Sequence, residues 1–186
     1  LEGSNLARIS KLKELMKKTI SLLDIKDVSE MPEKLFDVVK NNNEKIYNDF
    51  QELVECNLSV DWLQMIFQYY LADRKEKMQD YTPKTLADFM AKLVGNSDAT
   101  IIDMCAGSGA LTIQKWNKNH NLKFILYEFD ENVMPFLLFN MAVRNISCVI
   151  YHADVLQQEV FHTYEISKGK KYGFFKEVES GNFFNF

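Results

Sequence analysis

The sequence predicts an α/β fold, in which an α-helical region precedes a doubly wound parallel sheet. Up to about Leu71, apolar residues recur at the spacing of amphipathic helices. After Pro83, short apolar runs rich in β-branched residues alternate with helical segments, which is typical of βαβ units. The chain has 186 residues, of which 47% are hydrophobic and 26% are charged. Such a composition is that of an ordinary globular protein, which can bury a core without disulfides or metal ions.

Residues 1–80 form the predicted helical region. Four apolar stripes predict four helices, and the polar segments 24–32 and 40–45 are plausible connectors. Ser59 and Asp61 supply N-cap side chains before the last helix. The stripes consist of Leu12, Leu15, Met16, Ile20 and Leu23; Leu35, Val38 and Val39; Ile46, Phe50 and Leu53; and Trp62, Met65, Ile66 and Tyr69.

Residues 81–156 form the predicted α/β core. A helix over residues 85–94 ends at Gly95. Three strands are expected over residues 99–104, 122–129 and 148–152, with helices over residues 110–116 and 132–144 between them. Because a helix separates each pair of strands, the three strands should run parallel in one sheet.

Residues 157–186 carry weaker signals and form a tail of uncertain structure. Residues 160–166 fit either a strand or a helix, and residues 168–171 form a basic turn. The 30 residues after Leu156 have room for one further strand and a helix.

Charge, cysteine content and hydropathy narrow the class of protein. The formal net charge of -4 lacks the basic footprint of a protein that grips DNA unaided, so any contact with DNA should be weak or made through a partner. Cys56, Cys105 and Cys148 have no metal-binding spacing, and we expect free thiols and no metal site. The start of the sequence lacks the apolar core of a signal peptide, and the most apolar run, residues 134–143, is too short to span a bilayer. These features predict a soluble, cytoplasmic protein.

The candidate binding loop is Asp103-Met104-Cys105-Ala106-Gly107-Ser108-Gly109-Ala110, which follows the first predicted strand. Glycines at this place let the chain turn sharply and let a ligand approach the backbone closely. The helix after the loop offers free N–H groups to a carboxylate or phosphate. The loop resembles a dinucleotide fingerprint, but Thr112 stands where the third glycine belongs, which disfavours NAD. A G-x-G pair alone also occurs in simple tight turns between a strand and a helix.

Each of the three predicted strands is followed or ended by an acidic residue: Asp103, Glu128 and Asp154. The carboxyl ends of parallel strands meet at one edge of a sheet, where open α/β sheets bind ligands. An acid at the position of Glu128 can accept hydrogen bonds from both hydroxyls of a ribose. Asp154 would then face the amino group of an adenine. Each acid alone could be a solvated loop residue, but together with the glycine turn they predict a nucleoside site.

These segments resemble the motifs of adenine-N6 DNA methyltransferases, especially the modification subunits of type I restriction systems. The candidate binding loop is similar to their D-P-A-C-G-S-G motif, with Met104 in place of the proline. The other matches are Gln79-Asp80-Tyr81-Thr82-Pro83 with Q-x-Y-T-P, Tyr127-Glu128-Phe129-Asp130 with G-x-E-x-D, Phe139-Asn140-Met141 with A-x-x-N-(L/M), and His152-Ala153-Asp154-Val155-Leu156 with G-D-x-L. The resemblance covers about residues 70–156 and implies a truncated methyltransferase sheet of Rossmann-like type.

The resemblance also implies a cofactor, S-adenosylmethionine, and a role for each matching residue. It places Tyr81, Thr82 and Pro83 beside the methionine part of the cofactor. Around the amino acid end it places the loop residues Asp103, Ala106, Gly107, Ser108 and Gly109. Glu128 would bind the ribose, with Phe129 next to it, and Asp154 and Val155 would lie at the adenine ring.

One family motif does not occur in the sequence. The catalytic (D/N)-P-P-(Y/F) holds the flipped adenine by its amino group and stacks the base on its aromatic ring. The three prolines are Pro32, Pro83 and Pro135, and none follows the third predicted strand. We therefore identify no catalytic residue, and expect this chain alone to be inactive.

The resulting hypothesis is an adenine-specific DNA methyltransferase of a restriction-modification system, present as a fragment or a shortened relative. Its partners would be DNA and a specificity or complementary subunit. The alternative is a non-catalytic module that binds S-adenosylmethionine or a partner protein.

Overall fold

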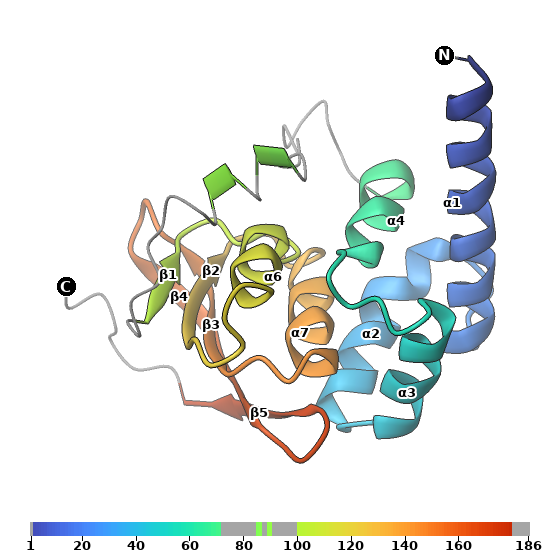
Figure 1. Cartoon of the computed structure of the whole chain (residues 1–186). Coiled ribbons are helices and arrows are strands. Elements are labelled where there is room, and N and C mark those ends of the chain that lie inside the picture. The colour runs from blue at the N-terminus through green and yellow to red at the C-terminus, as the bar shows by residue number, and fades with distance from the viewer. Residues whose placement is uncertain (1, 72–84, 87–88, 91–99, 180–186) are drawn as a thin grey trace.

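A layer of helices packs on a five-stranded mixed sheet, as Figure 1 shows. The structure is a computed structural model and describes residues 2–71, 85, 86, 89, 90 and 100–179. The α/β fold predicted from the sequence is confirmed, with the helical region before the sheet.

The four predicted helices of the first region are present. They are α1 (Glu2–Leu23), α2 (Met31–Lys40), α3 (Glu44–Leu53) and α4 (Trp62–Tyr70), with a short 3-10 helix η1 (Val28–Glu30) before α2. Polar side chains cap two of the α-helices at their N-termini. Asn43 accepts a hydrogen bond from the backbone N–H of Ile46 at 3.3 Å, and Asp61 accepts one from that of Gln64 at 2.9 Å.

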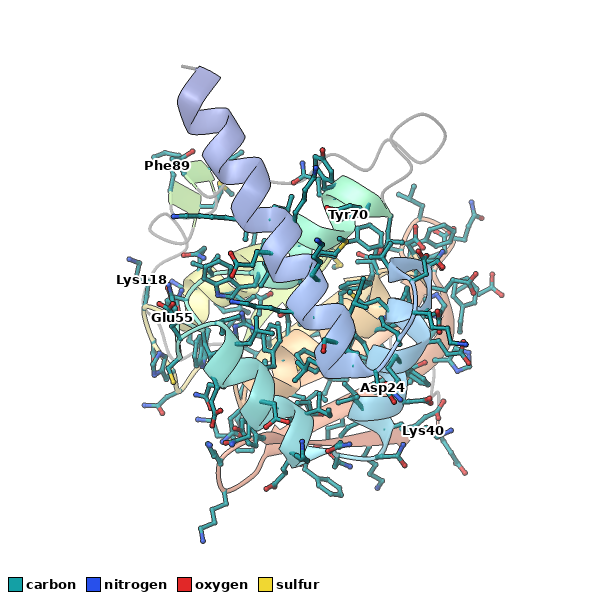
Figure 2. All side chains as sticks on the ribbon, turned by 90° about the vertical axis from the view of Figure 1, so that its right-hand side faces the viewer. Asp24, Lys40, Glu55, Tyr70, Phe89 and Lys118 are labelled. Carbon is teal, nitrogen blue, oxygen red and sulfur yellow. The ribbon has the colours of Figure 1, made fainter. Side chains whose placement is uncertain are left out.

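α1 is the outermost helix of this layer, as the two views of the molecule agree (Figures 1 and 2). Its C-terminal end is marked by Asp24, which has a positive φ of 54° and turns the chain toward α2. No helix among the described residues is long and apolar enough to cross a membrane.

The sheet has the strand order β1-β2-β3-β4-β5. Its first three strands, β1 (Ile101–Asp103), β2 (Phe124–Glu128) and β3 (Cys148–Asp154), are parallel, as the sequence predicts. The crossovers contain α6 (Ala110–Trp116) and α7 (Met134–Val143). The helix expected over residues 85–94 is described only at residues 85, 86, 89 and 90, which are helical.

The segment after Leu156, which from the sequence has room for one strand and a helix, forms strands. Two strands follow, β4 (Glu159–Lys168) and β5 (Gly173–Val178), and both are antiparallel to their neighbours. The backbone returns directly after β3 because Asp154 accepts bonds from the N–H groups of Leu156 and Gln157, both at 2.9 Å. An antiparallel return needs only this short turn, whereas a parallel strand would need a long crossover. The basic turn predicted over residues 168–171 joins β4 to β5.

α7 lies at the centre of the molecule, between the sheet and α2 (Figure 1). All ten of its residues are buried. Aromatic rings tie the helical region to it edge-to-face: Phe139 packs on Tyr47 and Phe50 of α3, with ring centroids 5.4 Å and 5.1 Å apart, and Phe136 packs on Phe67 of α4 at 5.1 Å. The buried residues of the helices and of this face of the sheet therefore form one continuous core.

Phe139→Ala should lower the free energy of unfolding by roughly 3–5 kcal/mol, because it removes the ring that α3 packs against and leaves a cavity. Urea denaturation measures this loss. The control is Phe174→Ala on β5, a ring that is largely exposed and should cost less than about 1 kcal/mol. Equal losses from the two variants would contradict the central role of α7.

Candidate functional site

The glycine loop, residues 104–109, leaves the carboxyl end of β1 and is fastened to β2. The backbone N–H of Ala106 donates to the carbonyl of Tyr127 at 2.8 Å, and that of Cys105 donates to the carboxylate of Asp103 at 3.2 Å. The loop then closes on itself, since the N–H of Gly109 bonds to the carbonyl of Ala106 at 2.9 Å. It thus lies across the end of the sheet, where ligands of such sheets bind.

The two glycines of the loop serve different purposes. Gly109 has a φ of +94°, and a Cβ there would lie 2.7 Å from Cε of Met141 and 3.1 Å from Cδ1 of Leu137, so the loop packs closely on α7. Gly107 has a φ of +56°, but a Cβ there would meet no atom of the described residues within 4 Å. The loop is therefore packed at Gly109 and open at Gly107.

Glu128 ends β2 and holds the open part of the loop. Its Oε2 accepts a hydrogen bond from the backbone N–H of Gly107 at 2.7 Å. Its Oε1 accepts two more, from the N–H of Phe129 at 3.0 Å and of Asp130 at 2.8 Å. A carboxylate has about four acceptor positions, so one remains open on Oε2 among the contacts of the described residues.

Asp103, Glu128 and Asp154 end three neighbouring parallel strands, as the sequence predicts. Asp103 pairs with Leu126, and Glu128 pairs with His152, so each acid stands two residues beyond the previous one along the sheet. Burial raises the pKa of Asp103 above its usual value, against the bond from Cys105. Burial also raises the pKa of Glu128, although three backbone N–H groups favour its charged form. The edge of the sheet is therefore acidic, and burial makes the carboxyl groups of Asp103 and Glu128 protonate more readily than exposed ones.

Asp154 is engaged in its own turn, where its Oδ1 holds the backbone of Leu156 and Gln157. Val155 is half-buried beside it and belongs to a small apolar cluster with Tyr127, Tyr151 and Ala153. This cluster is separate from the main core, and its buried members belong to β2 and β3, the strands that Glu128 and Asp154 end.

An aromatic group lies beyond Glu128 at the same edge. Phe129 is 62% exposed, and its carbonyl is 3.0 Å from Nε2 of His152. Phe161 of β4 lies near both side chains, with ring centroids 6.3 Å from Phe129 and 5.0 Å from His152. The structure thus places exposed apolar rings next to the acid that ends β2.

Three of the loop residues singled out from the sequence are buried: Ala106, Ser108 and Gly109. Ala106 belongs to the main core, and Ser108 is 2% exposed with its hydroxyl bonded to Asp61 at 2.6 Å. Among the described residues, the predicted site residues that face outward at this edge are Asp103, Gly107, Glu128, Phe129, Asp154 and Val155. Tyr81, Thr82 and Pro83 lie outside the described residues.

Sequence reasoning missed a buried polar group behind the loop, formed by Asp61, Asn140 and Arg144. Asp61 is predicted only as an N-cap, and Asn140 only as part of a motif on an apolar helix. The one signal of this network in the sequence was Asn140, a polar residue inside the apolar run of residues 134–143. No group of three or more His, Cys, Asp or Glu side chains in the described part of the chain is arranged to hold a metal ion.

More than half of the chain matches a model of a known protein family. A family model described as N-6 DNA Methylase matches residues 58–171, which is more than half of the chain. The match begins in the segment that carries Asp61 and runs through the glycine loop to the turn before β5. No curated protein and no solved structure matches the chain.

The three free cysteines offer a chemical test of the site's electrostatics. Partial burial raises the pKa of the Cys105 thiol, and the charges of Glu128 and Asp103 raise it further. Because the thiolate is the reactive form, Glu128→Gln should lower this pKa and speed alkylation of Cys105 at fixed pH, by about a few-fold. Mass spectrometry would follow the rates, with exposed Cys56 as the unchanged reference and buried Cys148 as a check on folding. Slower or unchanged modification of Cys105 would contradict this account.

Proposed function

The chain belongs to the N-6 DNA methylase family, and from this premise we propose that it binds S-adenosylmethionine at the glycine loop and serves methyl transfer to N6 of adenine in DNA. The observation that carries the proposal is the contact between Glu128 and the N–H of Gly107 at the carboxyl edge of the sheet. It joins the acid suited to a ribose to the loop suited to a charged amino acid end.

The residues at this edge fit such a cofactor. The open space beside Gly107 lets a ligand approach the backbone, as a side chain there would not. Among the contacts of the described residues, Oε2 of Glu128 keeps one open acceptor position for a hydroxyl group. Phe129 and Val155 supply apolar surface, which suits the faces of a purine ring. Acceptors, backbone and apolar groups of the right kinds thus lie within one segment of the edge.

We assign the parts of the cofactor to these residues as follows. Asp103 and Gly107 lie nearest the amino acid end, with Ala106, Ser108 and Gly109 shaping the loop from within. Glu128 binds the ribose. Phe129, Asp154 and Val155 lie at the adenine ring, and Tyr81, Thr82 and Pro83 complete the methionine end.

The cofactor, when bound, supplies a methyl group on a sulfonium centre, which an amino nitrogen attacks in line. The chain's own residues contribute position: they fix the donor at the sheet edge so that an acceptor can be aimed at it. The sequence contains no (D/N)-P-P-(Y/F) segment to hold the target base. We propose that this part comes from outside these 186 residues, in another part of the polypeptide or in another subunit of a restriction-modification system.

DNA contact by this chain alone is expected to be weak. The formal net charge is -4, and two lysines of the basic turn are already bonded to neighbouring loops. Nζ of Lys168 donates to the carbonyl of His120 at 3.1 Å, and Nζ of Lys171 donates to Asn48. A cytoplasmic enzyme complex would supply the remaining phosphate contacts through a partner.

The chain should bind S-adenosylmethionine and S-adenosylhomocysteine in preference to NAD, and Glu128→Ala should weaken that binding. Loss of a charge-assisted bond costs roughly 1.5–3 kcal/mol, which is on the order of a ten- to hundredfold loss in affinity. Isothermal calorimetry measures the effect, and Glu131→Ala, which removes an exposed acid from the same turn, is the control. The proposal fails if the wild-type chain shows no binding, or if Glu128→Ala binds as tightly as the wild type.

The chain alone should give only background methylation of adenine-containing duplex DNA. Flipping a base costs a few kcal/mol, which must be recovered by groups that hold the flipped base, and the family motif for this is absent from the sequence. Transfer of a radiolabelled methyl group from the cofactor to duplex DNA is the measurement. A chain that binds the cofactor but stays inactive with every complementary subunit would favour the alternative, a non-catalytic cofactor-binding module. Efficient transfer by the chain alone would show that another base pocket exists.

A further inference from the structure

A buried polar network connects the glycine loop to the segment before α4 and to α7. Its members are Asp61, Ser108, Asn140 and Arg144, and each of them is at most 5% exposed. Asp61 and Ser108 are far apart in the sequence, and the network is where the helical region meets the loop that we assign to the cofactor.

Ser108 is held at two points. Its hydroxyl donates to Oδ2 of Asp61 at 2.6 Å, and its backbone carbonyl accepts from Nδ2 of Asn140 at 2.8 Å. The same Nδ2 also donates to Oδ1 of Asp61 at 2.9 Å. Because Ser108 stands between Gly107 and Gly109, these bonds fix the residue on which the positions of both glycines depend.

Arg144 sets the orientation of the other members. Its Nη1 donates to Oδ1 of Asn140 at 2.8 Å, so the amide must turn its Nδ2 toward Asp61. Its Nε and Nη2 donate to the carbonyls of Leu58 and Val60, both at 2.8 Å, and hold the segment that carries Asp61. Burial lowers the pKa of Arg144 to about 10, with Asp61 opposing, so the guanidinium stays charged at neutral pH.

A buried polar network of this kind contributes little to stability by itself. A buried carboxylate and guanidinium cost much desolvation, and apolar residues of similar volume often stabilise a core as well or better. The position of the group directly behind the glycine loop gives a different reason for it. Glycines with positive φ leave a loop free to move, and a ligand that must order it loses affinity.

We propose that Asp61 is a positioning residue, which acts through Ser108 to hold the glycine loop in the conformation that binds the cofactor. The proposal rests on the proposed function of the site. Asp61 holds the loop from the buried side at Ser108, and Glu128 holds it from the open side at Gly107. The helical region thereby contributes to cofactor binding without touching the ligand.

The test is a double-mutant cycle with Asp61→Asn and Ser108→Ala, read out by calorimetry with S-adenosylhomocysteine. Each single variant should raise the Kd about tenfold. Because Asp61 acts through Ser108, the Kd of the double variant should be no higher than the higher of the two single-variant Kd values. The matched control is Asn43→Ala, which removes the side-chain N-cap of α3, an element outside the polar network. It should lower the melting temperature and leave the Kd unchanged.

Alkylation of the cysteines without any ligand gives a second readout. Release of the loop should speed modification of Cys105 in both network variants, while buried Cys148 stays unmodified in folded protein. Unchanged Kd values in the single variants, or effects that multiply in the double variant, would overturn the proposal. If the wild-type chain binds no cofactor, the proposed function fails, and the alkylation rates alone test the role of Asp61. Faster alkylation of Cys105 in the variants supports positioning of the loop by Asp61, and an unchanged rate refutes it.

Discussion

The structure depends on the complete burial of α7. A helix with apolar residues on every side is stable only if it is covered on every side, and no single layer can do so. The sheet covers one side of α7, and α2, α3 and α4 cover the other. The helical region is therefore part of the core rather than an appendage to it. Because Leu137 and Met141 of α7 also lie behind Gly109, the same helix supports the loop of the candidate site.

Two polar residues, one on this helix and one at its C-cap, explain how the core and the site are joined. Asn140 and Arg144 are one turn apart, so they lie on the same side of α7. In an apolar core each must be fully hydrogen-bonded, and the partners they find are Asp61, Ser108 and the backbone before α4. Removal of any one partner would leave a buried charge or amide unsatisfied. Burial of α7 thus fixes the network, and the network fixes the loop.

The sequence predicted what is encoded locally. The helices α1–α4 and the strands β1–β3 follow from the periodicity of apolar residues, and the positions of Asp103, Glu128 and Asp154 follow from the strands they end. For β4 the sequence was compatible with either a strand or a helix, and β5 was missed, because the pairing of both strands is decided by distant residues. Gly173, for example, packs so closely on Ala142 and Ile166 that a Cβ would lie 2.4 Å from a side-chain carbon. The bond between Asp61 and Ser108 was missed for the same reason: nothing in either local segment indicates the other.

The hydrogen bonds that Glu128 already accepts limit how the proposed ribose can be bound at this edge. In the part of the chain that the structure describes, backbone N–H groups take three of about four acceptor positions on its carboxylate, and two of these N–H groups belong to the turn after β2. One hydroxyl can be accepted without any loss, but a second requires that one backbone bond be given up. The bond to Gly107 is the one whose loss is best compensated, because that N–H lies at the open side of the loop, where a ligand oxygen can replace the carboxylate. In this exchange, the proposed ribose donates to Glu128 in place of the Gly107 N–H, and the Gly107 N–H donates to the ligand in place of Glu128. In the proposed function, a loop already held from behind at Ser108 can make this exchange without losing its shape, and the carboxylates of Asp61 and Glu128 then act together.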